Sequence, residues 1–130
     1  MFDSLALRTA LRIDAVASGG LGAMLLALCR SLDEPLGLPI VLSASVGAGL
    51  LAWAGLVSWI SIDATEPLAK EVVAANVVWV LGSCAFAVSG WVDLTAVGVA
   101  FVVVQALAVA GVTGMQVLAL REAARTAVPA

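Results

Sequence analysis

The sequence predicts an all-α integral membrane protein, an up-down bundle of four helices in two consecutive hairpins, with both termini in the cytoplasm. Composition is the first observation behind this prediction, because 63% of the 130 residues are hydrophobic and only 12% are charged. Soluble domains have roughly 45–50% and 25%. A water-soluble fold of this size would leave much of that apolar surface exposed, whereas lipid can surround it. The other two observations are the division of the apolar residues into four segments and the placement of the basic residues.

The four apolar segments contain no Lys or Arg and lie at residues 13–29, 40–62, 72–92 and 94–120. About 20 helical residues cross a hydrocarbon core of ~30 Å. The last three segments are long enough, and the first becomes long enough if its helix extends back past Arg12, whose side chain can reach the headgroups. With their flanking turns, the segments predict helices over about residues 11–30, 40–62, 64–92 and 94–122 of one transmembrane domain, residues 1–130.

The first and second helices are separated by residues 31–39. This stretch contains Pro35, Gly37 and Pro39, which interrupt a helix and favour a turn. We therefore expect a short ordered loop here, followed at once by the second helix.

Capping residues indicate where the third and fourth helices begin. Asp63 is the expected N-cap of the third helix, and Glu66, three residues later, would complete a capping box. Only residues 89–93 then separate the third helix from the fourth, so these two helices form a tight hairpin. Asp93 or Thr95 is the expected N-cap of the fourth helix.

Basic residues are distributed unequally between the two faces of the predicted bundle. Of the six Lys and Arg residues, only Arg30 lies on the face opposite the termini. Positively charged loops stay in the cytoplasm, which places both termini there. The side chains expected to anchor the bundle at its two interfaces are Arg8, Arg12, Trp59, Trp91 and Arg121.

Polar residues inside the apolar segments are the candidates for a functional site. A buried Asp costs about 2.5–3.5 kcal/mol at mid-membrane, but Asp14 is the second residue of its segment, where the cost is smaller. Ser18, Asn76 and Gln116 share the cytoplasmic third of the bundle with Asp14, so one hydrogen-bond network is plausible. Gln105 lies on the same helix face as Gln116, and this face should point to the interior or to a partner.

Small residues recur at spacings that keep them on one face of each helix. Helices in lipid depend on such residues for close packing, because apolar side chains gain little from leaving lipid for one another. The positions expected to pack against other helices are Gly19, Gly22, Ala48, Gly82, Ala106, Ala110 and Gly114.

Residue usage also excludes several function classes. The chain contains no His and no Tyr, and its two Cys residues have no metal-type spacing. Without the usual general bases and metal ligands, we expect no metal, no cofactor and no enzymatic activity. A net charge of -3 with no basic run also argues against nucleic acid as a partner.

Three short motifs are spread over most of the chain: Arg12-Ile13-Asp14 in the first helix, Asn76 followed by Trp79-Val80 in the third, and Leu94-Thr95 followed by Gln105-Ala106 in the fourth. In these motifs the chain resembles uncharacterised bacterial four-helix inner-membrane proteins. The resemblance implies a topology and a bacterial inner membrane, and it brings no assigned activity.

Together these features predict a non-catalytic polytopic membrane protein. The expected role is that of an accessory or structural subunit that binds another membrane protein, a second copy of itself, or lipid. The alternative is a small homo-oligomeric transporter or channel for a small polar or cationic solute, in which Asp14, Asn76, Gln105 and Gln116 would line the path.

Overall fold

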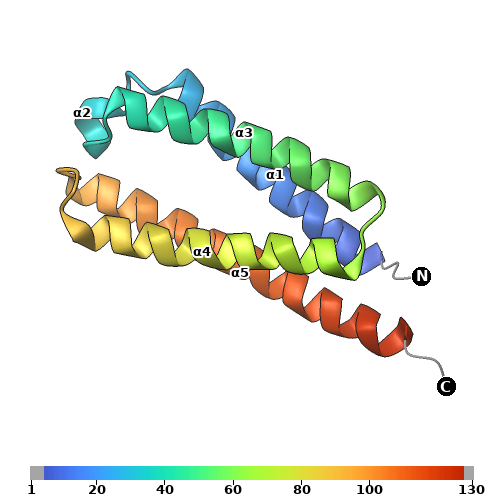
Figure 1. The fold of residues 1–130 in the computed structure, drawn as a ribbon. Coiled ribbons are helices and arrows are strands. Elements are labelled where there is room, and N and C mark those ends of the chain that lie inside the picture. The colour runs from blue at the N-terminus through green and yellow to red at the C-terminus, as the bar shows by residue number, and fades with distance from the viewer. Residues whose placement is uncertain (1–4, 128–130) are drawn as a thin grey trace.

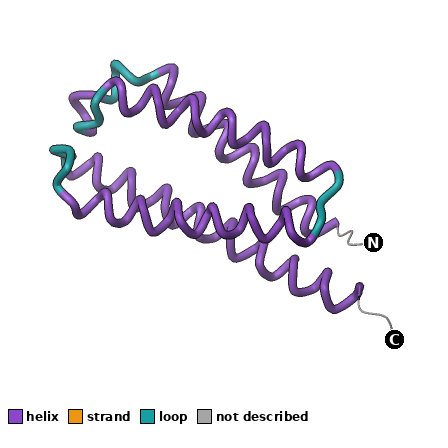
Figure 2. The backbone as a smooth tube through the Cα atoms, in the orientation of Figure 1, coloured by secondary structure: helices purple, strands orange, loops and turns teal. Residues whose placement is uncertain are grey.

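The computed structural model describes residues 5–127, and in this range it contains helices and loops but no strand (Figure 1 and Figure 2). The helices are α1 (Leu5–Ala27), α2 (Asp33–Leu36), α3 (Ile40–Ile62), α4 (Glu66–Ser89) and α5 (Ala96–Ala127). All except α2 are long and apolar enough to cross a membrane. The predicted all-α fold with four long apolar helices is therefore confirmed. Such helices are typical of a multi-pass membrane protein.

Helices α1 and α3 form a closely packed hairpin because two glycines face each other. A Cβ added to Gly22 would lie 2.7 Å from the carbonyl oxygen of Gly47, and a Cβ added to Gly47 would lie 2.7 Å from the carbonyl oxygen of Gly22. Contacts this short exclude any side chain at either position. Gly22 thus packs as predicted, whereas its partner Gly47 was not among the predicted packing residues.

Helix α2 closes one end of the bundle by binding the start of α5. The hydroxyl of Thr95 donates to the carbonyl oxygen of Pro35 at 2.6 Å and accepts from the backbone N–H of Gly98 at 3.0 Å. The backbone N–H of Thr95 donates to the carbonyl oxygen of Leu36 at 3.1 Å. Thr95 rather than Asp93 therefore caps α5, and the predicted loop between the first two helices contains a helical turn.

Other helix boundaries also differ from the predicted ones. Helix α1 begins at Leu5 rather than residue 11, because Leu7 and Leu11 are both buried in the core and extend the helix. Helix α4 begins at Glu66 rather than residue 64, with Thr65 instead of Asp63 as its N-cap. Helix α1 ends at residue 27 rather than 30, and α4 ends at residue 89 rather than 92. Helix α5 extends to residue 127 rather than ending at 122.

The α1–α3 and α4–α5 hairpins are joined most firmly at the end that carries the termini, and their ribbons diverge toward α2 (Figure 1). Helix α1 packs against α5 as well as α3, whereas α3 and α4 have few contacts. The hydrophobic core draws on all four long helices, and its members include Leu7, Leu11, Val57, Val72 and Leu120. These residues come from the half of each helix nearest the termini.

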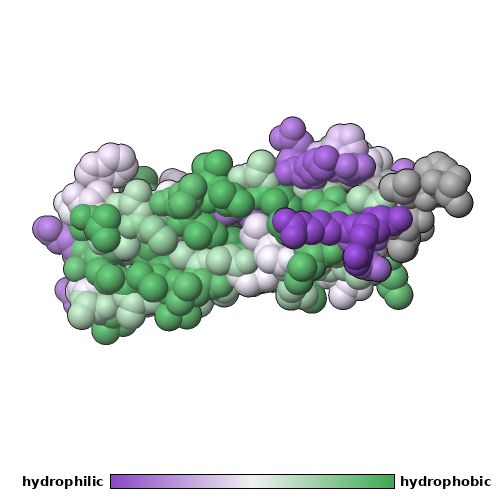
Figure 3. All heavy atoms as spheres, turned by 90° about the horizontal axis from the view of Figure 1, so that it is seen from below, coloured by the Kyte–Doolittle hydropathy of each residue, from purple (hydrophilic) through white to green (hydrophobic). Residues whose placement is uncertain are grey.

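The outer surface is apolar over most of its length. Figure 3 shows hydrophobic side chains over most of one face and hydrophilic ones gathered mainly toward one end. Exposed large apolar side chains include Val41, Val78, Leu81, Leu107 and Leu118. Such a surface is unfavourable in water and suits hydrocarbon.

Candidate functional site

A cluster of four polar side chains, Asp14, Ser18, Asn76 and Gln116, links α1, α4 and α5. Asn76 Nδ2 donates to Asp14 Oδ2 at 2.7 Å, and Gln116 Nε2 donates to the same oxygen at 2.8 Å. Asn76 Nδ2 also donates to Gln116 Oε1 at 3.1 Å. The hydroxyl of Ser18 donates to Asp14 Oδ1 at 3.1 Å. We call these four residues the polar cluster, and it is the network that their shared depth predicted.

Three members of the polar cluster are deeply buried, and Ser18 is half-buried. Asp14 and Asn76 are each 4% exposed, and Gln116 is 0% exposed. Asp14 is the tenth of the 23 residues of α1, so it lies further from the start of its helix than predicted, because α1 begins at Leu5 rather than residue 11. Within the described range, residues 5–127, no Lys or Arg forms an ion pair with Asp14.

Gln105 forms a separate pair with Trp79. Trp79 Nε1 donates to Gln105 Oε1 at 2.9 Å, and Gln105 Nε2 donates to the carbonyl oxygen of Val102 at 2.9 Å. Gln105 and Gln116 both turn inward, as predicted, but they are eleven residues apart, about three turns of helix. Gln105 is therefore too far along α5 to join the polar cluster.

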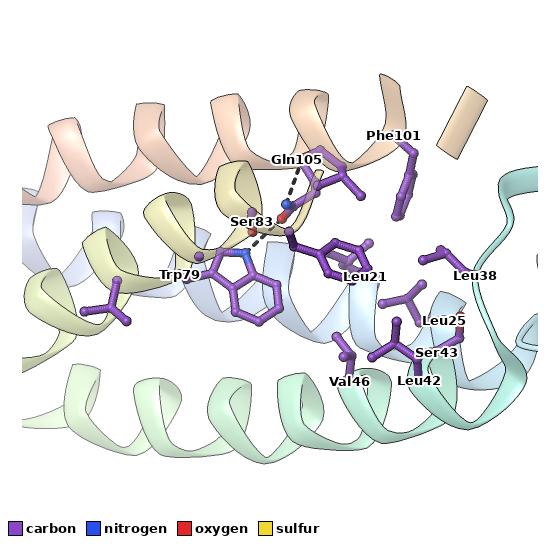
Figure 4. A pocket seen from close by; sticks show the side chains of 14 residues that line it. Leu21, Leu25, Leu38, Leu42, Ser43, Val46, Trp79, Ser83, Phe101 and Gln105 are labelled. Carbon is purple, nitrogen blue, oxygen red and sulfur yellow. Dashed lines mark hydrogen bonds between the residues drawn. The ribbon is translucent and has the colours of Figure 1, made fainter. Parts of the chain in front are cut away.

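Two cavities lie between the hairpins and meet at the Trp79–Gln105 pair. The polar cavity has a volume of about 480 Å³, and its walls include Asp14, Ser18 and Asn76. The apolar cavity has a volume of about 340 Å³ (Figure 4). Both are within the roughly 300–1,000 Å³ typical of ligand sites. The residues that line both cavities are Leu21, Val46, Trp79 and Gln105.

The apolar cavity is lined mainly by aliphatic and aromatic side chains, among them Leu25, Phe86 and Phe101. Its wall also contains the Ser43 hydroxyl (Figure 4). Ser43 is 2% exposed, and its Oγ forms no hydrogen bond with any described residue. The sequence offered no signal for Ser43, because a serine near the start of a helix is common.

The cavities open to the surface along the seam between α3 and α4. Gly49 of α3 lines the polar cavity, and Gly82 of α4 lines the apolar cavity. Both glycines are exposed, and a Cβ added to either would meet no atom within 4 Å. Since α3 and α4 have few contacts, a molecule could enter between them.

The remaining packing predictions have mixed outcomes. Ala106 is buried at 3% exposure, and a Cβ added to Gly19 would lie 3.4 Å from the Cβ of Ala54. The predicted packing of Gly82 and Gly114 is not found in this chain, since a Cβ at either would meet nothing within 4 Å. Ala48 and Ala110 are likewise exposed. The face of α3 that meets α1 carries Gly47 instead. Gly47 is one residue before Ala48, the packing residue predicted on this helix.

The expected interfacial anchors lie on the outside of the bundle. Trp59 and Trp91 are 65% and 86% exposed and lie near opposite ends of the bundle. Arg12 and Arg121 are exposed, and Arg8 is half-buried. Their positions agree with an anchoring role, which requires contact with the surroundings.

Residues 5–127 contain no group of three or more His, Cys, Asp or Glu side chains that could hold a metal ion. Comparison with family models, with curated proteins and with solved structures finds no match to this chain. The two cavities and the polar cluster are the features of the described residues that could bind a ligand.

Proposed function

We propose that this chain is a non-catalytic membrane protein that binds a membrane amphiphile, a lipid or lipid-like molecule, between its two hairpins. The observation that supports this most directly is the pair of adjoining cavities that open between α3 and α4. In a bilayer this seam faces hydrocarbon, so an amphiphile can enter sideways. Its chain would contact Leu25 and Phe101, and its head would lie beside the polar cluster.

A role as an accessory subunit is the second part of this proposal. Ala48 and Gly55 on α3, and Ala110 and Gly114 on α5, form exposed small-residue faces. Small side chains let another transmembrane helix approach the backbone closely. These faces are where another membrane protein, or a second copy of this chain, would pack.

We further propose that the chain resides in a bacterial inner membrane with both termini in the cytoplasm. The support is the placement of positive charge at one end of the bundle. Arg30 alone lies at the α2 end. The basic residues at the other end are Arg8, Arg12, Lys70, Arg121 and Arg125.

Filling the apolar cavity tests the binding of an amphiphile. Gly82→Leu places a large side chain in the cavity mouth and is expected to lower the amount of lipid retained by the purified protein about tenfold, as a loss of 1.4 kcal/mol would. Native mass spectrometry in mild detergent measures the bound fraction. Gly111→Leu is the matched control, because Gly111 is exposed, has no atom near its Cβ position and lines neither cavity. Equal lipid retention by the two variants would refute the proposal.

Transport of a small polar or cationic solute is a second candidate, favoured by Asp14, Asn76 and Gln105 in the wall of one cavity. If the protein transports such a solute, Asp14→Asn and Gln105→Leu should each reduce flux into liposomes about tenfold by removing about 1.4 kcal/mol of solute binding. Glu71→Gln, an exposed acid at the start of α4, should leave flux unchanged. Unchanged flux in both cavity variants would exclude this candidate.

A further inference from the structure

We infer that the polar cavity binds the protonated amino group of an amphiphilic amine, with the Asp14 carboxylate as counter-ion and Asn76 Oδ1 as a second acceptor. This inference rests on the proposed function and names the chemical class of its ligand. Three observations carry it: the charge of Asp14, the hydrogen-bonding capacity of the polar cluster, and the aromatic rings in the same wall.

The first observation is that Asp14 has only neutral partners. Its carboxylate accepts hydrogen bonds from Asn76, Gln116 and Ser18, and none of the described Lys or Arg residues pairs with it. A carboxylate buried away from water is stabilised when a positive charge lies beside it. Because Asp14 lines the polar cavity, a cationic ligand there could supply that charge.

The second observation is that the members of the polar cluster that line the cavity, Asp14, Ser18 and Asn76, carry acceptor oxygens. Asn76 Nδ2 donates to both Asp14 Oδ2 and Gln116 Oε1. Asn76 Oδ1 accepts no hydrogen bond from the described residues. The Ser18 hydroxyl donates its hydrogen bond to Asp14, so its oxygen can act only as an acceptor. An ammonium group carries donors and no acceptor, so it matches these oxygens. A carboxylate or phosphate head would instead be repelled by the Asp14 carboxylate.

The third observation is the aromatic wall. Trp53 and Trp79 line the polar cavity together with Asp14, and a cation near an indole face gains about 0.5–2 kcal/mol. The ligand's apolar part would continue past Leu21 and Val46 into the apolar cavity, whose wall those two residues share. Asp14 is the sole acid among the residues that line the two cavities, so an organic cation fits better than Ca²⁺ or Mg²⁺, which require several oxygen ligands.

Titration with matched probes tests this inference on purified full-length protein at constant detergent concentration. Trp59→Phe and Trp91→Phe leave Trp53 and Trp79, the two cavity tryptophans, as fluorescent reporters. Octylammonium is expected to bind about tenfold more tightly than octanol, which has the same chain and no charge. Octyltrimethylammonium keeps the charge but cannot donate a hydrogen bond, so it should bind more weakly than octylammonium.

Two pairs of variants assign the binding to the polar cavity. Asp14→Asn should lower the affinity for octylammonium about tenfold and leave that for octanol unchanged. Glu71→Gln makes the same chemical change at an exposed site outside the cavities and should alter neither. Gly49→Leu, which fills the polar cavity, should lower the affinity for both probes. Gly55 is on the same helix, and a Cβ added there would also meet no atom within 4 Å. Gly55→Leu should therefore leave the affinity for both probes unchanged.

The outcomes separate this inference from the proposed function. Octanol binding with no preference for octylammonium would overturn the amine site and leave the amphiphile site standing. Absence of binding by either probe, or equal binding by Gly49→Leu and Gly55→Leu, would overturn both. If Asp14→Asn does not fold, the ratio of the two wild-type affinities still decides the question.

Discussion

Replacing Gly22 with alanine is expected to separate α1 from α3 and to destabilise the bundle by about 3 kcal/mol, the upper end of the usual cost of overpacking. The new Cβ would lie 2.7 Å from the carbonyl oxygen of Gly47 and 2.9 Å from the Cβ of Leu50. The first of these is a backbone atom and cannot rotate away. The two helices would therefore have to move apart, with loss of neighbouring contacts.

Unfolding by SDS in detergent, followed by circular dichroism, measures this effect. Gly20→Ala is the matched control because Gly20 lies two residues away on the same helix and has no atom within 4 Å of its Cβ position. Its free energy of unfolding should change by about 0.5 kcal/mol or less. Alanine favours a helix more than glycine does, so propensity alone would not lower stability, and an equal loss in both variants would show that the contact between α1 and α3 is not responsible.

Replacing Gln116 with leucine is the second change with a large expected effect, a loss of about 3 kcal/mol. Gln116 is completely buried. It donates to Asp14 Oδ2 at 2.8 Å and accepts from Asn76 at 3.1 Å. Leucine would remove one of the hydrogen-bond donors to the buried Asp14 carboxylate. It would also remove the Gln116 oxygen that accepts a hydrogen bond from Asn76. Unsatisfied buried groups of this kind cost far more than an average membrane hydrogen bond.

Gln105→Leu is the control for this second prediction, because it makes the same change on the same helix face. Gln105 is half-buried and bonds to the indole N–H of Trp79, with no charged partner. The expected loss is about 0.6 kcal/mol, the average for hydrogen bonds within membranes. The same SDS titration compares the two variants, and a similar loss in both would show that the charge of Asp14 is not what makes Gln116 important.

Part of the candidate site could be predicted from sequence. Asp14, Asn76 and Gln116 lie at similar depths in their helices, and side chains at one depth can meet when helices pack side by side. The place of Asp14 along its helix was misjudged, because Arg12 suggested that the helix begins only a few residues before Asp14. Leu7 and Leu11 extend α1 in the other direction, which places Asp14 well inside the bundle.

The cavities could not be predicted, because they depend on which helices fail to meet. Gly22 and Gly82 are both glycines inside apolar segments, and both were expected to pack. Gly22 touches the backbone of Gly47, whereas Gly82 borders the open seam between α3 and α4. Composition, spacing and periodicity do not distinguish the two.

Sequence alone determined that this protein has four long helices and that their surfaces suit lipid rather than water. Four long apolar segments need lipid around them, and in lipid a lone segment satisfies its backbone hydrogen bonds as a helix. Only the tertiary structure decided which helix faces meet, where the cavities lie and which polar residues share hydrogen bonds. The physical reason is that lipid and helix interfaces are about equally apolar, so hydrophobicity does not mark the inner face, and shape and hydrogen bonding select it.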